Sequence, residues 1–298
     1  MSKRNWALLA ATFVSVIYGI TFTIAKDVMP AFVDAYGFIV LRVFFSMLLF
    51  WMVSFAGPKE TIAKADFPRI VAAAFFGVAL NMLTFFKGLS FTTPISAAVI
   101  MVTTPIIVLV LSAVIIKEKL EIKKIIGIFL GAFGTLILIL YGKSIGNAPN
   151  ASLGNFLVFV NAVSYGFYLI IVKKLMDKYN AFTFVKWIYS FGFLMVLPFG
   201  WQEIEAVVWS AMPMSIYLKI GFVVFFSTFL TYLLNLVSMR ELKPTTVAVF
   251  IYFQPFFATI FAIGLQKDTL NLVKIVAATL IFVGVFLVTR TKSKPIEN

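Results

Sequence analysis

One arginine lies deep inside an apolar stretch of this 298-residue chain. Arg42 stands seven residues into the apolar run 35–56, a depth at which a cation needs a partner, water or a ligand. The planar guanidinium can hold a carboxylate through two hydrogen bonds, which the ammonium of lysine does less well. We therefore expect Arg42 to hold the carboxylate of a substrate. The alternative is that its long side chain carries the charge to the membrane surface.

Uncharged polar side chains in other apolar runs form a second group of candidates. Amides there must face protein or a watery cavity, because an unpaired amide in hydrocarbon is costly, or they join helices by hydrogen bonds. Tyrosines combine an apolar ring with one polar group, so they suit a cavity for flat or apolar solutes as well as ordinary packing. The candidates for lining a substrate cavity are Tyr18, Arg42, Asn81, Thr103, Asn161, Tyr165, Tyr168, Tyr232, Asn235, Tyr252 and Gln254.

Two prolines stand in the middle of apolar runs. Pro105 removes the hydrogen bond to the carbonyl of Met101, and Pro255 does the same to Ile251, which bends each helix. Prolines also occur in membrane helices without any special role. Because these two fall at equivalent places in the two halves of the chain, we expect them to be hinges.

The elements that must position these residues are membrane helices. The chain is 62% hydrophobic and 12% charged, whereas soluble domains are roughly half apolar and about a quarter charged. It has no cysteine and no histidine, which are the usual groups for hydrolytic and metal chemistry, so we expect no enzyme activity, no metal and no cofactor. The net charge of +13 does not indicate nucleic acid, because membrane proteins gather cations in their cytoplasmic loops.

The acidic residues are equally informative. All twelve stand at the ends of apolar runs or in loops. Proton relays in membranes normally use intramembrane carboxylates or histidines. We therefore expect facilitated or exchange transport, or coupling through a group that the sequence does not identify, rather than proton coupling through a central acid. Glu118, between Lys117 and Lys119, is expected to pair with a nearby lysine at the inner surface, where such pairs contribute little stability.

Ten apolar runs are long enough to cross a bilayer, for which a helix needs about 20 residues. They are 5–25, 35–56, 69–89, 94–116, 124–141, 153–172, 181–201, 215–237, 244–265 and 272–290. With the N-terminus inside, seventeen Lys and Arg residues fall on inner segments and six on outer ones. Because cations favour the cytoplasmic side, we expect a multi-pass protein of the plasma (inner) membrane with both termini in the cytoplasm.

The second half of the chain repeats the first. A shift of 150 positions places Pro94 on Pro244 and Gly134 on Gly284. With five spans in each half, the second copy enters the membrane from the opposite side, and inverted repeats can open a shared site to either side in turn. The expected fold is an all-α polytopic membrane protein with ten transmembrane helices in two inverted five-helix repeats. The expected units are a first repeat at 1–141, a linker at 142–152, a second repeat at 153–290 and a basic tail at 291–298.

Two long segments share a small-residue run, a mid-helix proline, an acid-containing loop and a last helix with glycine. They are KGLSFTTPISAAVIMVTTPIIVLVLSAVIIKEKLEIKKIIGIFLGAFGTLILI (87–139) and LKPTTVAVFIYFQPFFATIFAIGLQKDTLNLVKIVAATLIFVGVFLV (242–288). Both resemble the fourth and fifth helices of an EamA domain, in the drug/metabolite transporter superfamily. IYGITFTIAK resembles the first helix of that domain, and Arg42 in FIVLRVFF stands where its second helix commonly carries an arginine. The resemblance implies ten helices around a central cavity and the transport, often export, of amino acids and other small metabolites.

Several readings stay open beside metabolite export. Import or exchange of a metabolite fits the same fold, and a passive channel belongs to a different class. A membrane-embedded enzyme would need a nucleophile–base pair or a metal cluster that the residues do not provide. Gly127 and Gly131 permit close helix contact either inside a monomer or between the subunits of a homodimer. The expected partners are a small-molecule metabolite and the lipid bilayer.

Overall fold

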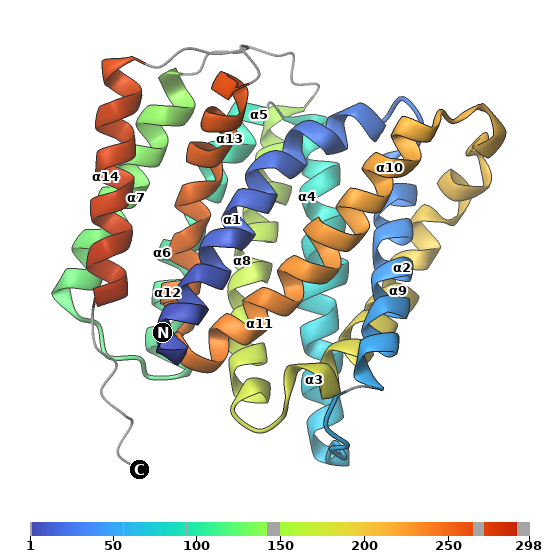
Figure 1. The fold of residues 1–298 in the computed structure, drawn as a ribbon, viewed down its shortest axis with the longest axis horizontal. Coiled ribbons are helices and arrows are strands. Elements are labelled where there is room, and N and C mark those ends of the chain that lie inside the picture. The colour runs from blue at the N-terminus through green and yellow to red at the C-terminus, as the bar shows by residue number, and fades with distance from the viewer. Residues whose placement is uncertain (1, 56, 93, 142–149, 265–270, 291–298) are drawn as a thin grey trace.

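The computed structural model describes residues 2–55, 57–92, 94–141, 150–264 and 271–290. Within these ranges the chain is helical and has no strand, as the sequence predicts. The predicted tail 291–298, and residues 142–149 of the predicted linker, lie outside them. The helices pack side by side in one bundle (Figure 1).

The helices of the first half are α1 (Lys3–Val28), α2 (Ala35–Ser54), α3 (Phe67–Ala74), α4 (Leu80–Phe91), α5 (Pro94–Met101), α6 (Thr104–Ile115) and α7 (Ile122–Tyr141). A 3₁₀ turn at Lys64–Asp66 precedes α3, and a π-helical segment at Phe75–Ala79 joins α3 to α4.

The helices of the second half are α8 (Ala151–Met176), α9 (Ala181–Glu205), α10 (Met214–Phe222), α11 (Thr231–Glu241), α12 (Pro244–Val249), α13 (Phe253–Gly264) and α14 (Leu272–Arg290). A 3₁₀ turn at Trp209–Ala211 precedes α10, and a π-helical segment at Val223–Leu230 joins α10 to α11. A further 3₁₀ turn at Phe250–Tyr252 joins α12 to α13.

The order of these elements is the same in both halves. Each half begins with a helix of 26 residues, α1 or α8. A second long helix follows, α2 or α9, and then a 3₁₀ turn, an α-helix, a π-helical segment and another α-helix. Each half ends with an interrupted helix and a final long one. In Figure 1, α1 runs away from the face that holds the N-terminus, whereas α8 runs toward it.

Eight helical stretches of the described chain are long and apolar enough to cross a membrane. They are Ala35–Ser54, Lys64–Phe91, Ala97–Ile115, Ala151–Met176, Ala181–Glu205, Met214–Glu241, Pro244–Phe261 and Leu272–Arg290. α1 and α7 cover the predicted spans 5–25 and 124–141; they are 26 and 20 residues long but are not among these eight.

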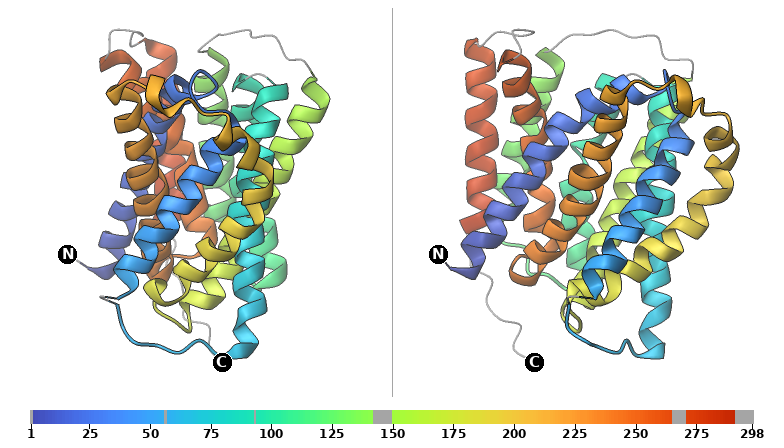
Figure 2. Two further views of the ribbon diagram at one scale, coloured as in Figure 1. Left: turned by 90° about the vertical axis from the view of Figure 1, so that its right-hand side faces the viewer. Right: turned by 45° about the vertical axis from the view of Figure 1, so that its right-hand side comes forward.

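Side-chain caps and chain-end contacts fix where several helices begin. The side-chain oxygens of Ser2, Asn150 and Asn180 accept hydrogen bonds from backbone N–H groups in the first turns of α1, α8 and α9. The guanidinium of Arg4 donates to the backbone carbonyl of Thr289. The start of α1 and the end of α14 therefore lie at the same face of the bundle, as Figure 2 also shows.

Glu118 is buried, so the prediction of a surface pair is wrong. Its Oε1 accepts hydrogen bonds from Lys124 Nζ at 2.5 Å and from the Thr245 hydroxyl at 2.7 Å, and all three residues are buried. Lys117 has a left-handed backbone (φ 51°) and the N–H of Glu118 donates to the carbonyl of Ser112, so the chain doubles back just before the carboxylate. The ion pair joins the α6–α7 connection to α7, and the hydrogen bond from Thr245 joins it to α12. Loss of one partner of a buried pair costs about 3–5 kcal/mol.

Glycines bring α7 and α14 into backbone contact within one chain. A Cβ atom placed on Gly284 would lie 2.5 Å from the carbonyl oxygen of Gly127 and from the amide nitrogen of Gly131. A Cβ atom on Gly134 would lie 2.7 Å from the carbonyl oxygen of Ala277. The small residues of the two helices therefore serve packing inside the monomer.

Replacing Gly284 with leucine should lower thermal stability, because the added atoms must push α7 and α14 apart and overpacking costs about 1–3 kcal/mol. The measurement is the temperature at which the detergent-solubilised protein loses its monodisperse elution peak. Gly221→Leu is the matched control, since nothing lies within 4 Å of a Cβ atom there. Equal midpoints for the two variants would contradict the proposed contact.

Candidate functional site

A cavity of about 200 Å³ lies between the two halves of the chain. Sites for drug-sized ligands typically have volumes of about 300–1,000 Å³, so this cavity suits a small solute. Both halves contribute to its wall. The lining residues are Tyr18, Thr21, Ala25, Met29, Arg42, Asn81, Met82, Phe85, Phe86, Leu89, Met101, Asn161, Tyr165, Ser227, Tyr232, Ile251 and Gln254.

Arg42 is the only charged side chain among the described residues of this lining. It is 8% exposed, and its Nε donates a hydrogen bond of 3.0 Å to the Thr228 hydroxyl. Its Cζ lies 5.8 Å from the ring centroid of Phe38 and 5.7 Å from that of Phe86, within range for cation–π attraction. Within the described residues no carboxylate pairs with it. The cavity therefore holds a positive charge that no acidic residue of the described chain balances.

Two asparagines connect α4 and α8 at the cavity wall. Asn161 Nδ2 donates to the backbone carbonyl of Asn81 at 2.7 Å, and Asn81 Nδ2 donates to that of Asn161 at 3.4 Å. The side-chain oxygen of Asn161 is buried and accepts no hydrogen bond in the described structure. Asn161 thus joins two helices and leaves one acceptor that a ligand or water can fill.

The two π-helical segments supply polar groups next to this wall. The Thr228 hydroxyl donates to the carbonyl of Val223, five residues earlier, while it accepts from Arg42. The Ser227 hydroxyl lines the cavity and has no hydrogen-bond partner in the described chain. In the first half, the carbonyl of Gly77 accepts a 2.7 Å hydrogen bond from the Tyr232 hydroxyl. Such segments occur frequently at functional sites.

α1 reaches the cavity through a close approach to α13. A Cβ atom on Gly19 would lie 3.0 Å from the carbonyl oxygen of Gln254, so only glycine permits this separation without a shift. The neighbouring Tyr18 lines the cavity and its hydroxyl lies 3.1 Å from Thr231 Oγ1. Tyr165, the counterpart of Tyr18 in the second half, lines the cavity as well.

The predicted hinge prolines follow interruptions in their helices. α5 ends at Met101 and α6 begins at Thr104, next to Pro105; a 3₁₀ turn separates α12 from α13, which contains Pro255. Proline has no N–H for the carbonyl four residues earlier. Those residues, Met101 and Ile251, both line the cavity.

The cavity extends toward one face of the bundle. Its lining runs along α1 from Tyr18 to Met29, the residue just after this helix, and along α4 from Asn81 to Leu89. Both stretches run toward the helix end away from the N-terminal face (Figure 1). On the N-terminal side, buried aromatic rings pack against Tyr232. The rings of this aromatic cluster are Phe50, Tyr168, Tyr189, Phe229 and Tyr232, with neighbouring centroids 4.6 to 6.0 Å apart.

Four predicted cavity residues do not line it. The Thr103 hydroxyl donates to a carbonyl of its own turn, and the Tyr252 hydroxyl donates to a carbonyl in the α5–α6 connection. Tyr168 belongs to the aromatic cluster, and Asn235 is buried in α11. Conversely, sequence reasoning missed Thr21, although it follows Tyr18 by three positions and so shares its helix face.

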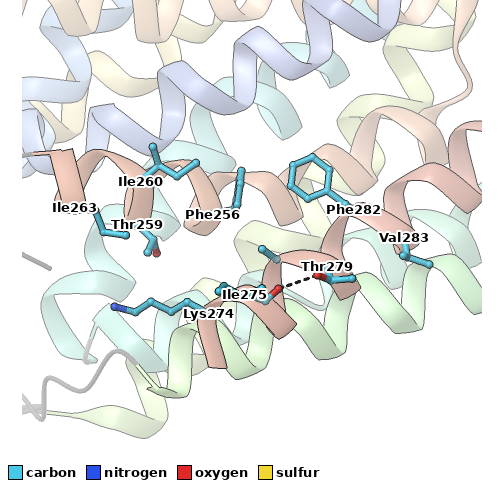
Figure 3. Close-up of a pocket in the computed structure, with 10 residues that line it drawn as sticks. Phe256, Thr259, Ile260, Ile263, Lys274, Ile275, Thr279, Phe282 and Val283 are labelled. Atoms are coloured by element: carbon cyan, nitrogen blue, oxygen red, sulfur yellow. Dashed lines mark hydrogen bonds between the residues drawn. The ribbon is translucent and has the colours of Figure 1, made fainter. Parts of the chain in front are cut away.

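A second hollow, of about 430 Å³, lies between α13 and α14 (Figure 3). Its described lining comes from the second half alone and is mostly apolar, with Ile260 and Phe282 about half exposed. Lys274 lies at one end of the hollow, and the Thr279 hydroxyl donates a hydrogen bond to the carbonyl of Ile275 in its own helix. Because it lacks converging polar groups, we assign the candidate site to the cavity between the halves.

Comparison with known proteins agrees with this arrangement. An uncharacterized transporter of Bacillus subtilis, YetK, is 24% identical over 99% of this chain and 90% of its own length. An uncharacterized transporter of Archaeoglobus fulgidus is 25% identical over 97% of this chain and 100% of its own length. One solved structure superposes with a TM-score of 0.77 at 17% identity, covering 96% of this chain and 98% of its own, and this likeness is one of fold alone.

The sequence model of the EamA-like transporter family matches the chain twice, at residues 5–140 and at residues 152–290. The two matches leave out little more than the connection between the halves and the chain ends. The chain therefore belongs to the EamA-like transporter family and is a multi-pass membrane transporter.

Proposed function

We propose that this protein is an alternating-access secondary transporter that moves a small metabolite through the cavity around Arg42. The observation that carries the proposal is a small cavity that is mostly apolar, takes polar side chains from both halves and is flanked by two interrupted helices. Secondary transporters bind their substrates between repeats, beside discontinuous helices whose freed backbone groups face the site.

We further propose ten membrane spans in two inverted repeats, with 1–141 and 153–290 as the repeats and 142–152 as the linker. The shared order of elements, the double family match and the opposite directions of α1 and α8 support this arrangement. It makes α1 and α7 the two spans beyond the eight already identified. The contact between Arg4 and Thr289 supports both termini on one side, which we take to be the cytoplasm of a cell with an inner membrane.

In that orientation the cavity extends toward the outside and is closed toward the cytoplasm. The closure consists of the aromatic cluster and of the buried ion pair between Glu118 and Lys124 with its hydrogen bond from Thr245. These contacts join the two halves, so they must separate before a solute can leave on the cytoplasmic side. The same closure favours a transporter over a passive channel, which needs a continuous path.

The substrate class we propose is amino acids and related compounds, and the direction is export. Arg42 has no acidic partner among the described residues, which supports a solute that carries a carboxylate. We propose export because transporters of this family often export their substrates. Import or exchange by the same site is the alternative. The described lining contains no carboxylate, which favours facilitated or exchange transport over proton coupling at the site.

Purified protein in liposomes should take up a mixture of labelled metabolites with saturable kinetics, and an unlabelled substrate trapped inside should accelerate uptake. Acceleration by the trans substrate is expected because a loaded cavity can return directly to the outer side. A flux that rises linearly with concentration, with no acceleration, would indicate a channel. Empty liposomes provide the baseline.

Replacing Pro105 with alanine should slow transport several-fold while the protein still folds. Alanine restores an N–H for the carbonyl of Met101, so the helix loses the bend that we assign to the hinge. Initial uptake rates and the elution profile in detergent separate the two effects. Pro198→Ala is the matched control, because Pro198 also lies inside a helix, α9, but lines no part of the cavity. Equal uptake rates in the Pro105→Ala and Pro198→Ala variants would contradict the hinge role of Pro105.

Single cysteines can report topology without background, because the chain has none of its own. Ser2→Cys and Lys174→Cys should resist a membrane-impermeant maleimide in intact cells, and Ala151→Cys should react. All three positions are exposed in the structure. Permeabilised cells, in which every site should react, are the control. Labelling at 2 and 151 from the same side would refute the proposed five crossings between them.

A further inference from the structure

We infer that the cavity selects its solute by a carboxylate group, and that a hydroxyl can take the place of an α-ammonium group on that solute. The inference rests on the proposed transport function. It deepens that proposal by naming the chemical group that the site recognises and the one that it does not require.

The charge of the lining gives the first argument. Arg42 is the one charged side chain among the described lining residues, and no carboxylate of the described chain pairs with it. A buried charge is costly unless it is paired. A bound carboxylate supplies the missing counter-charge, whereas a solute with only a positive charge is repelled.

The geometry of the guanidinium gives the second argument. The Thr228 hydroxyl accepts a hydrogen bond from Nε of Arg42, and in the described structure the two terminal nitrogens of Arg42 make no hydrogen bond. The rings of Phe38 and Phe86 lie beside the guanidinium and limit its movement. The unpartnered Ser227 hydroxyl is a further donor on the lining. These groups match a planar, two-oxygen acceptor.

The acceptor that we assign to the second polar group of the solute is a neutral amide oxygen. Asn161 lines the cavity, and its buried Oδ1 has no donor in the described chain. An amide oxygen accepts a hydrogen bond from a hydroxyl as well as from an ammonium group. An ammonium group loses strong hydration on entry and finds no acid among the described lining residues, so the hydroxyl has the lower cost of transfer.

The rest of the solute must be apolar and small. Met82, Phe85 and Leu89 form an apolar stretch of α4 along the cavity, whose volume is about 200 Å³. A branched aliphatic or single-ring body fits these walls. The expected ligands are therefore compact 2-hydroxy and 2-amino carboxylates.

The test uses four labelled probes that share the isobutyl side chain of leucine. They are leucine, 2-hydroxy-4-methylpentanoate, leucinamide and 3-methylbutylamine. In proteoliposomes the two carboxylates should show saturable uptake, with the hydroxy acid at least as good as leucine. The two compounds without a carboxylate should be taken up at least about tenfold less well, the effect of losing a charged hydrogen bond.

Two variants connect the selection to its residues. Arg42→Gln should lower uptake of both carboxylates at least about tenfold. Lys186→Gln should not, because Lys186 is a partly buried cation that lies against Trp51 and Ser54, away from the cavity. Asn161→Asp, which adds an acid, should shift the preference from the hydroxy acid toward leucine. Elution profiles and thermal midpoints identify any variant that fails to fold.

The possible failures are distinct. Uptake of leucinamide equal to that of leucine, exclusion of the hydroxy acid, or unchanged uptake by a folded Arg42→Gln variant would each overturn the inference. Saturable transport of other metabolites, with none of the four probes, would overturn it too but leave the transport function intact. Absence of saturable flux for every compound would remove the proposed function itself.

Discussion

The positive charge of Arg42, which no acid of the described residues balances, is the constraint on which the site depends. A guanidinium inside a membrane helix is costly, so it must be met by polar or aromatic groups or by water. The structure meets it with the Thr228 hydroxyl, two aromatic rings and an adjoining cavity, and with no acid among the described residues. A protein carboxylate at this point would cancel the charge and remove the reason for an anionic solute to bind. In the proposed function, a bound ligand supplies the missing counter-charge.

Irregular helix geometry is what places neutral polar groups beside this charge. Regular helices in a membrane satisfy their own backbone and leave only side chains for recognition. Here the Thr228 hydroxyl donates a hydrogen bond to a backbone carbonyl of one π-helical segment, and the Tyr232 hydroxyl donates one to a backbone carbonyl of the other. The breaks before Pro105 and Pro255 act in the same region, because Met101 and Ile251 line the cavity. The four irregular segments thus concentrate at the place where the two halves meet.

Apolar run lengths were sufficient to predict the helices, and a polar residue in such a run was sufficient to nominate Arg42 and Asn161. Which face of a helix a residue occupies was harder to predict, because every tyrosine in a membrane span has lipid, core and cavity as possible surroundings. Tyr165 lines the cavity, whereas Tyr168, one turn later, packs in the aromatic cluster. Ser227 was not predicted, since a helical hydroxyl normally bonds a carbonyl of its own turn. Nothing in the sequence marks the π-helical segment that leaves it free.

The two halves share the order of their helices, but they do not share the charged residue of the site. The position of Arg42 is occupied in the second half by Ile188, which is buried in the aliphatic and aromatic core. The charge that attracts a solute therefore belongs to the first half alone, while Thr228 and Ser227, which complete its surroundings, belong to the second. In the proposed mechanism, a rocking motion of one half against the other would change the distance between the charge and those hydroxyls. Binding and opening would then be coupled, because a ligand that spans Arg42 and the second half would resist their separation until the closing contacts on the other face have changed.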